Sequence, residues 1–177
     1  VRLVLVAALA AAGAAQAATT LIYCSEGSPE GFDPARYTAG TTFNASSQPV
    51  FNRIVEFEIG GTKVIPGLAE SWTISPDGLV YTFKLRKGVK FHASDSFKPT
   101  RDFNADDVVF TFDRMINKEN AFNKAAPASF EYAQDMGLPD NIVRIDKPDA
   151  LTVRFTLKKV DAAFLANLAM DFASIHS

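Results

Sequence analysis

Two segments of the chain alternate apolar and polar side chains with the period of a β-strand. They span residues 79–86 and 151–158. Their apolar positions are Leu79, Tyr81, Phe83 and Leu85 in the first segment, and Leu151, Val153, Phe155 and Leu157 in the second. Because successive side chains of a strand point to opposite faces, this period predicts a sheet with one buried and one solvated face.

A third segment repeats apolar residues at helical spacing. They are Val108, Val109, Phe112, Met115 and Ile116. Asn104 is a favourable N-cap residue, Asp107 stands three positions later as in a capping box, and Asp106 adds a second negative charge at the positive helix end. The pattern predicts a helix from Asn104 to about Asn117 that buries its apolar face.

Shorter runs predict further elements around these three. A strand at 71–75 is followed by a turn at 76–78 (Pro-Asp-Gly), in which Pro fixes φ and Gly accepts a positive φ. Gly and Pro break residues 25–34 and 123–141, so both segments are predicted to be irregular. Further strands are predicted at 20–24, 64–65 and 142–146, and one more follows a helix around 48–53 and ends at 59. Turns are predicted at 60–63 and 147–149, and a last helix at 161–170.

Residues 1–17 are predicted to be a signal peptide. Arg2 supplies a positive charge, residues 3–15 are apolar or small, and residues 15–17 (Ala-Gln-Ala) fit the cleavage pattern. The run is shorter than the ~20 apolar residues of a spanning helix. The alternative, a buried N-terminal helix, is disfavoured because the run has no polar face. We therefore expect an exported protein with residues 18–177 as its mature part.

Cys24 is the only cysteine of the chain. Tyr23 precedes it, where a lipid-attachment site would have a small residue, and Cys24 lies beyond the predicted cut. A soluble exported protein is therefore expected. A lone cysteine in an oxidising compartment indicates a missing partner or a free thiol, and the alternative is a buried, inert cysteine.

Charge gives no support to a nucleic-acid or anionic-membrane partner, since 18 Lys and Arg stand against 20 Asp and Glu. The only two histidines, His92 and His176, have no metal-ligand neighbours at zinc-like spacing, and His92 is predicted to be a structural residue at or near the surface. No nucleophile elbow or phosphate-cradling glycine loop is present. We therefore predict no enzyme, metal or cofactor. The basic residues Lys84, Arg86, Lys87 and Lys90 are interpreted as the solvated face of a strand and its turn.

The run from Gly67 to Phe112 resembles the signature region of the bacterial extracellular solute-binding proteins of family 5, which serve peptide and nickel ABC transporters. The resemblance rests on 67–72 (GLAESW), 85–90 (LRKGVK) and 103–112 (FNADDVVFTF). Residues 21–32 and 169–175 are similar to the dipeptide branch of that family. Residues 93–101 depart from many members, although the dipeptide branch has a comparable stretch.

The resemblance implies an α/β, periplasmic-binding-protein-like fold of two lobes, of which this chain holds part of the first lobe with its inserted mixed α/β subdomain. Members are far longer, so the chain is expected to be an N-terminal fragment. The implied function is that of a periplasmic receptor that delivers dipeptides to an inner-membrane ABC permease, with a chemoreceptor as a further partner and a monomer as the complete form. Alternatives are a family receptor for oligopeptides, nickel or another small solute, a secreted hydrolase, and an exported structural or adhesion module.

The resemblance also implies three site residues. Thr38 matches a position that contacts the bound dipeptide, and Gly40 and Thr41 are its neighbours. A hydroxyl offers one donor and two acceptor sites, but Thr38 could alternatively bond its own backbone in a turn. The resemblance places the disulfide partner of Cys24, and the acidic residue that pairs with the peptide's amino group, outside this chain.

Overall fold

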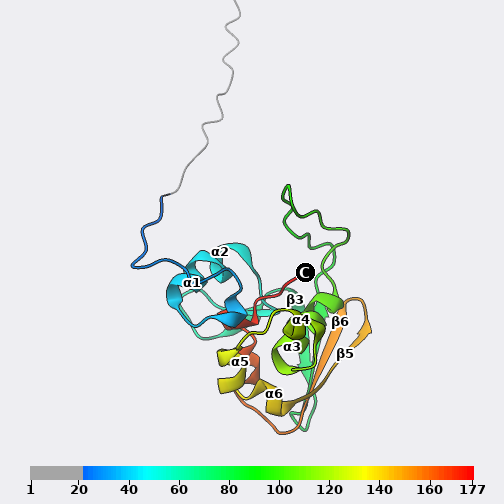
Figure 1. The fold of residues 1–177 in the computed structure, drawn as a ribbon. Coiled ribbons are helices and arrows are strands. Elements are labelled where there is room, and N and C mark those ends of the chain that lie inside the picture. Colours follow the sequence, from blue (N-terminus) through cyan, green and yellow to red (C-terminus); the bar gives the residue numbers. More distant parts are fainter. Residues whose placement is uncertain (1–21) are drawn as a thin grey trace, which may run out of the picture.

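A computed structural model describes residues 22–177, so the predicted signal peptide lies outside the described residues. The fold is mixed α/β (Figure 1). Its strands are β1 (Val55–Phe57), β2 (Val64–Pro66), β3 (Ala69–Ile74), β4 (Val80–Leu85), β5 (Ile142–Asp149) and β6 (Thr152–Leu157). Its helices are η1 (Pro34–Arg36), α1 (Gly40–Ala45), α2 (Ser47–Val50), α3 (Ala105–Ile116), α4 (Ala121–Ala125), α5 (Glu131–Asp135), α6 (Leu138–Asn141), α7 (Phe164–Asn167) and η2 (Asp171–Ala173). Among these described residues no helix is both long and apolar enough to span a bilayer.

The main sheet has four antiparallel strands in the order β3-β4-β6-β5, and β1 and β2 form a separate hairpin. The two alternating segments are its central strands, with Tyr81 of β4 opposite Phe155 of β6. Positions 81, 83 and 85 of β4 and 153, 155 and 157 of β6 are all buried, whereas Lys84 is exposed and Arg154 is only partly buried. The predicted division into a buried and a wetter face is therefore confirmed.

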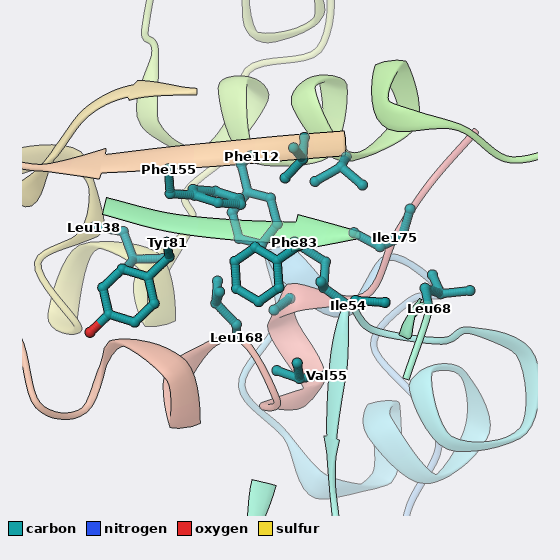
Figure 2. Packing of buried hydrophobic residues seen from close by; sticks show 14 of the residues in the cluster. Ile54, Val55, Leu68, Tyr81, Phe83, Phe112, Leu138, Phe155, Leu168 and Ile175 are labelled. Atoms are coloured by element: carbon teal, nitrogen blue, oxygen red, sulfur yellow. The ribbon is translucent and has the colours of Figure 1, made fainter. Parts of the chain in front are cut away.

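Aromatic side chains form the centre of the core on the buried face of the sheet (Figure 2). The ring centroid of Phe155 lies 5.1 Å from that of Phe112 on α3, 5.9 Å from Phe83 on β4 and 5.7 Å from Phe164 on α7. All four side chains are fully buried. Helix α3 and the C-terminal segment thus close the same face of the sheet.

The predicted long helix forms α3 with the expected cap. The Asn104 side chain accepts a hydrogen bond from the Asp106 amide at 2.8 Å, and Asp107 Oδ2 accepts one from the Asn104 amide at 2.9 Å. Arg101 donates to both oxygens of Asp107, at 2.7 and 2.9 Å. The cap and this ion pair fix where the helix starts, and with it the buried face that packs on the sheet.

Several shorter predictions were wrong in their extent. Residues 123–141 are not irregular throughout, because α4, α5 and α6 interrupt them and leave only 126–130 and 136–137 without regular structure. Each of these helices is too short for its apolar residues to form a periodic pattern. The helix expected at 161–170 is confined to α7, and the helix expected at 48–53 to α2. Strand β5 continues through the turn expected at 147–149. Of the strand expected at 20–24, the described residues 22–24 have no regular structure.

Gly67 lies where two backbone segments approach closely. A Cβ added there would come within 2.5 Å of the Arg53 carbonyl oxygen and 3.1 Å of the Ile54 carbonyl oxygen. The adjacent amides of Leu68 and Ala69 donate to these same oxygens, at 2.9 Å each, so the segments cannot separate without breaking hydrogen bonds.

Gly67→Ala is expected to lower the free energy of unfolding by about 1–3 kcal/mol, the usual cost of overpacking. Denaturant unfolding measures this loss. Gly40→Ala is the matched control, because an added Cβ there meets nothing within 4 Å. Equal stability of the two variants would contradict the close approach at Gly67.

Candidate ligand-contact site

Residues 25–39, here called the N-terminal loop, carry Thr38 to the start of α1. Its middle is tied to that helix, since the Glu30 amide donates to Thr42 Oγ1 at 3.0 Å and Thr41 Oγ1 donates to the Ser28 carbonyl at 3.4 Å. Thr38 itself is exposed, and within residues 22–177 no hydrogen bond holds its side chain. Its hydroxyl is therefore open to a partner from outside.

The three site residues suggested by the sequence lie together but differ in their surroundings. Gly40 is exposed and is the first residue of α1. Thr41 is half-buried, and its hydroxyl is already used to hold Ser28. Among the three, Thr38 has the side chain best placed to contact a ligand.

Tyr37 shapes the loop next to Thr38. Its ring lies against the Cα of Gly31, so closely that any side chain at position 31 would collide with the ring. A side chain at position 31 would therefore require the Tyr37 ring to shift.

An ion pair anchors the N-terminal loop to helix α3. Asp33 accepts two hydrogen bonds from Arg114, with Nη1–Oδ2 at 2.5 Å and Nη2–Oδ1 at 2.9 Å. Asp33 also caps η1, by accepting from the Ala35 amide at 3.2 Å. His176 Nε2 lies 3.3 Å from Asp33 Oδ1. Three distant parts of the chain thus meet at one carboxylate, which sequence reasoning did not identify.

The Arg114 side chain is buried among aromatic rings. Its side chain is 2% exposed, and its guanidinium carbon lies 5.4 Å from the ring centroid of Phe122, 5.6 Å from Phe130 and 6.0 Å from Phe110. A cation facing aromatic rings is stabilised by their quadrupoles, and the bidentate carboxylate supplies the opposite charge. Arg114 is therefore a rigid anchor for Asp33.

The surroundings of Asp33 favour its ionised form. Burial by itself would raise the pKa of this carboxyl, but the hydrogen bonds from Arg114, the nearby His176 ring and the attraction of both groups hold its pKa well below the ordinary value. The carboxylate is thus charged at neutral pH, and the ion pair with Arg114 is intact.

The C-terminal residues complete the site from the other side. The Ile175 amide donates to the Asn52 carbonyl at 3.0 Å, and the His176 amide donates to Thr111 Oγ1 at 3.0 Å. This segment therefore bridges the chain after α2 and helix α3. The His176 ring packs on Phe51, with centroids 4.6 Å apart.

Phe51 and His176 line two cavities. The first, of about 450 Å³, is lined by aromatic and charged side chains that include Phe32, Asp33, Tyr37 and Arg114. The second, of about 290 Å³, is mainly apolar and is lined by Phe51, Leu68, Phe91, Phe97, Phe103 and Ile175. Tyr37, the residue before Thr38, lines the first cavity, whereas Thr38 lines neither of the two.

The remaining candidates from the sequence lie away from this site. Cys24 is exposed, so the alternative of a buried cysteine is wrong. The basic cluster is on the surface as predicted, with Lys84 donating to Thr152 Oγ1 at 2.7 Å and Lys90 to Asp102 at 2.5 Å. Across residues 22–177 no three His, Cys, Asp or Glu side chains gather in a way that could hold a metal ion.

Residues 63–177 match the family described as Bacterial extracellular solute-binding proteins, family 5 Middle. Di/tripeptide-binding protein 1 of Pseudomonas aeruginosa (strain UCBPP-PA14) is 64% identical over 97% of this chain and 32% of its own length. Heme-binding protein A of Haemophilus influenzae (strain ATCC 51907 / DSM 11121 / KW20 / Rd) is 52% identical over 89% of this chain and 29% of its own length.

Among solved structures, the dipeptide binding protein from Pseudoalteromonas sp. SM9913 in complex with Met-Leu superposes with a TM-score of 0.85. It is 39% identical, and the match covers 89% of this chain and 31% of that one. The chain thus spans about a third of the length of the relatives it matches.

Proposed function

The chain belongs to the bacterial extracellular solute-binding proteins of family 5, and we propose that the complete protein binds dipeptides in the periplasm and delivers them to an inner-membrane ABC permease. The observation that carries this proposal is the 64% identity to a di/tripeptide-binding protein over nearly the whole chain. The complex of a similar fold with Met-Leu supports the same ligand class.

In this proposal the chain forms one part of the peptide-binding cleft. Residues 18–177 supply part of the first lobe and its inserted subdomain, with Thr38, Gly40 and Thr41 facing the ligand. Closure of a second lobe over the peptide would create the surface that the permease recognises, so binding shifts a population of closed states. Export, a monomeric complete form, contact with a chemoreceptor and a disulfide from Cys24 to a residue elsewhere in the protein belong to the same proposal.

Other ligands of the same family are the main alternative. Oligopeptides, nickel and further small solutes need testing, and so does heme, because the relative from Haemophilus influenzae is named for it. A secreted hydrolase is the alternative from another class. A receptor binds saturably and releases its ligand intact, whereas a hydrolase turns it over.

The experiment uses a full-length protein that contains this chain. We define the chimera as the Pseudomonas aeruginosa relative in which residues 22–177 of this chain replace the matching segment. Calorimetry with dipeptides, tripeptides, longer peptides, nickel and heme, followed by mass analysis of the recovered ligand, separates the alternatives. Saturable binding of intact dipeptides is expected, whereas cleavage, or binding of only another ligand class, would contradict the proposal.

Thr38→Val in the chimera tests the site residue itself. Valine keeps the shape of threonine but removes the hydroxyl, so a hydrogen bond to the peptide is lost and Kd is expected to rise about tenfold. Thr156→Val, on the outer face of β6, is the matched control and should leave Kd unchanged. An unchanged Kd for Thr38→Val would remove Thr38 from the site.

A further inference from the structure

Asp33 makes the ion pair that ties the N-terminal loop to helix α3. Asp33 lies five positions before Thr38, and η1 (Pro34–Arg36) joins the two. Its carboxylate both caps η1 and accepts the two hydrogen bonds from Arg114. The position of Thr38 is thus linked to helix α3 through a single side chain.

We propose that Asp33 is a positioning residue for ligand binding, because its ion pair with Arg114 holds the N-terminal loop in the conformation that presents Thr38. This inference rests on the proposed function, since it concerns the same ligand site. Asp33 does not itself need to contact the peptide. Its role is to keep the free protein in the conformation that binds.

Burial and aromatic contacts confine the Arg114 side of the ion pair. Arg114 has almost no exposed surface and is enclosed by Phe110, Phe122 and Phe130. Its backbone carbonyl also accepts from Asn123 Nδ2 at 2.6 Å. A guanidinium held in this way determines where the Asp33 carboxylate must lie, and so where the loop lies.

The other hydrogen bonds of the loop are weaker than the Asp33 pair. They are the Glu30–Thr42 bond of 3.0 Å, the long Thr41–Ser28 bond of 3.4 Å and the long Arg36–Pro127 bond of 3.4 Å. Packing adds to them, because η1 carries the buried Pro34 and Ala35 and contacts α5 and η2. Neutral or solvent-exposed hydrogen bonds each contribute little, whereas a bidentate, partly buried ion pair contributes more. Loss of the Asp33 charge should therefore loosen the loop without unfolding the sheet.

Asp33→Asn in the chimera separates the two roles of this side chain. Asparagine can still cap η1 but cannot form the ion pair. If the loop then occupies its binding conformation about one tenth of the time, the measured Kd rises about tenfold. Hydrogen exchange should speed up at the amides of Glu30, Ala35 and Arg36 and stay slow at Phe83 and Phe155 in the sheet.

Two further variants make the test decisive. Asp102→Asn removes an exposed carboxylate paired with Lys90 and is the matched control, expected to leave both Kd and loop exchange unchanged. Arg114→Lys keeps the charge but loses the two-pronged contact, so a several-fold rise in Kd is expected even if Asp33→Asn fails to fold.

The possible outcomes separate this inference from the proposed function. If the chimera without any point substitution binds no peptide, the proposed function is contradicted, and so is the inference that rests on it. A chimera that binds, with Kd unaltered in Asp33→Asn and Arg114→Lys, overturns the inference alone. An equal loss of affinity in Asp102→Asn also overturns it, because the effect would then be one of net charge.

Discussion

Replacing Phe155 with alanine is expected to lower the free energy of unfolding by about 3–5 kcal/mol, the usual cost of truncating a buried Phe. Phe155 is fully buried and packs on Phe83, Phe112 and Phe164, so it joins the sheet to α3 and α7. A cavity at this point would remove contacts from all three partners. Hydrogen exchange of the β4 and β6 amides in the chimera reports the loss locally.

Two controls identify the cause of that loss. Phe155→Leu retains most of the apolar volume and should cost about 1.5 kcal/mol or less. Thr156→Ala, one position along β6 on its outer face, should change stability by about 0.5 kcal/mol or less. A loss below about 1 kcal/mol in Phe155→Ala would contradict the position of Phe155 at the centre of the core.

Arg114→Met is expected to cost about 3 kcal/mol. Methionine fills the space among the three Phe rings but leaves the Asp33 carboxylate partly buried, with the Ala35 amide and the His176 ring beside it and no guanidinium to balance its charge. Because the damage comes from an unpaired charge, the double variant Asp33→Asn/Arg114→Met should regain part of the stability. Denaturant unfolding of the three proteins measures the loss and the recovery.

Lowering the pH should remove the stabilisation that the Asp33–Arg114 ion pair provides. The folded-state pKa of Asp33 is depressed, so its stabilising contribution is present above the ordinary Asp pKa of about 3.9 and disappears as the pH falls below that value. Arg114→Met should therefore flatten this part of the acid stability profile. A double variant no more stable than Arg114→Met, with an unaltered acid profile, would show that the ion pair carries no such energy.

The sequence was sufficient where a pattern repeats within one element. Alternation in 79–86 and 151–158 predicted the two central strands and their buried face, because a strand side chain has only two directions. The Asn104 cap and the spacing after it predicted α3 to within a residue at each end. The turn at 76–78 has the positive φ of 71° at Gly78 that its composition predicted.

The parts that escaped prediction depend on contacts between distant residues. Asp33 and Arg114 are 81 positions apart, and nothing around either of them marks the other as its partner. His176 is near the far end of the chain, and its approach to Asp33 depends on the path of the C-terminal segment beside α3. The only local signal was Asp33 before Pro34, a pattern typical of a helix cap.

The short helices escaped for a different reason. Helices α4, α5 and α6 have five, five and four residues, which is barely a turn each. Isolated helices of this length are unstable in water, so they form here because tertiary packing holds them, and no periodic pattern records them. Thr38 is proposed only through resemblance, since an exposed residue leaves no trace in the hydrophobic pattern.

A calorimetric titration of Met-Leu into the chimera, and into residues 18–177 alone, examines whether this chain supplies one side of a peptide-binding cleft. We expect saturable heat with one site per chimera, recovery of the intact dipeptide, and no detectable heat for the isolated chain. Absence of heat in the chimera, or equally tight binding by the isolated chain, would contradict this expectation.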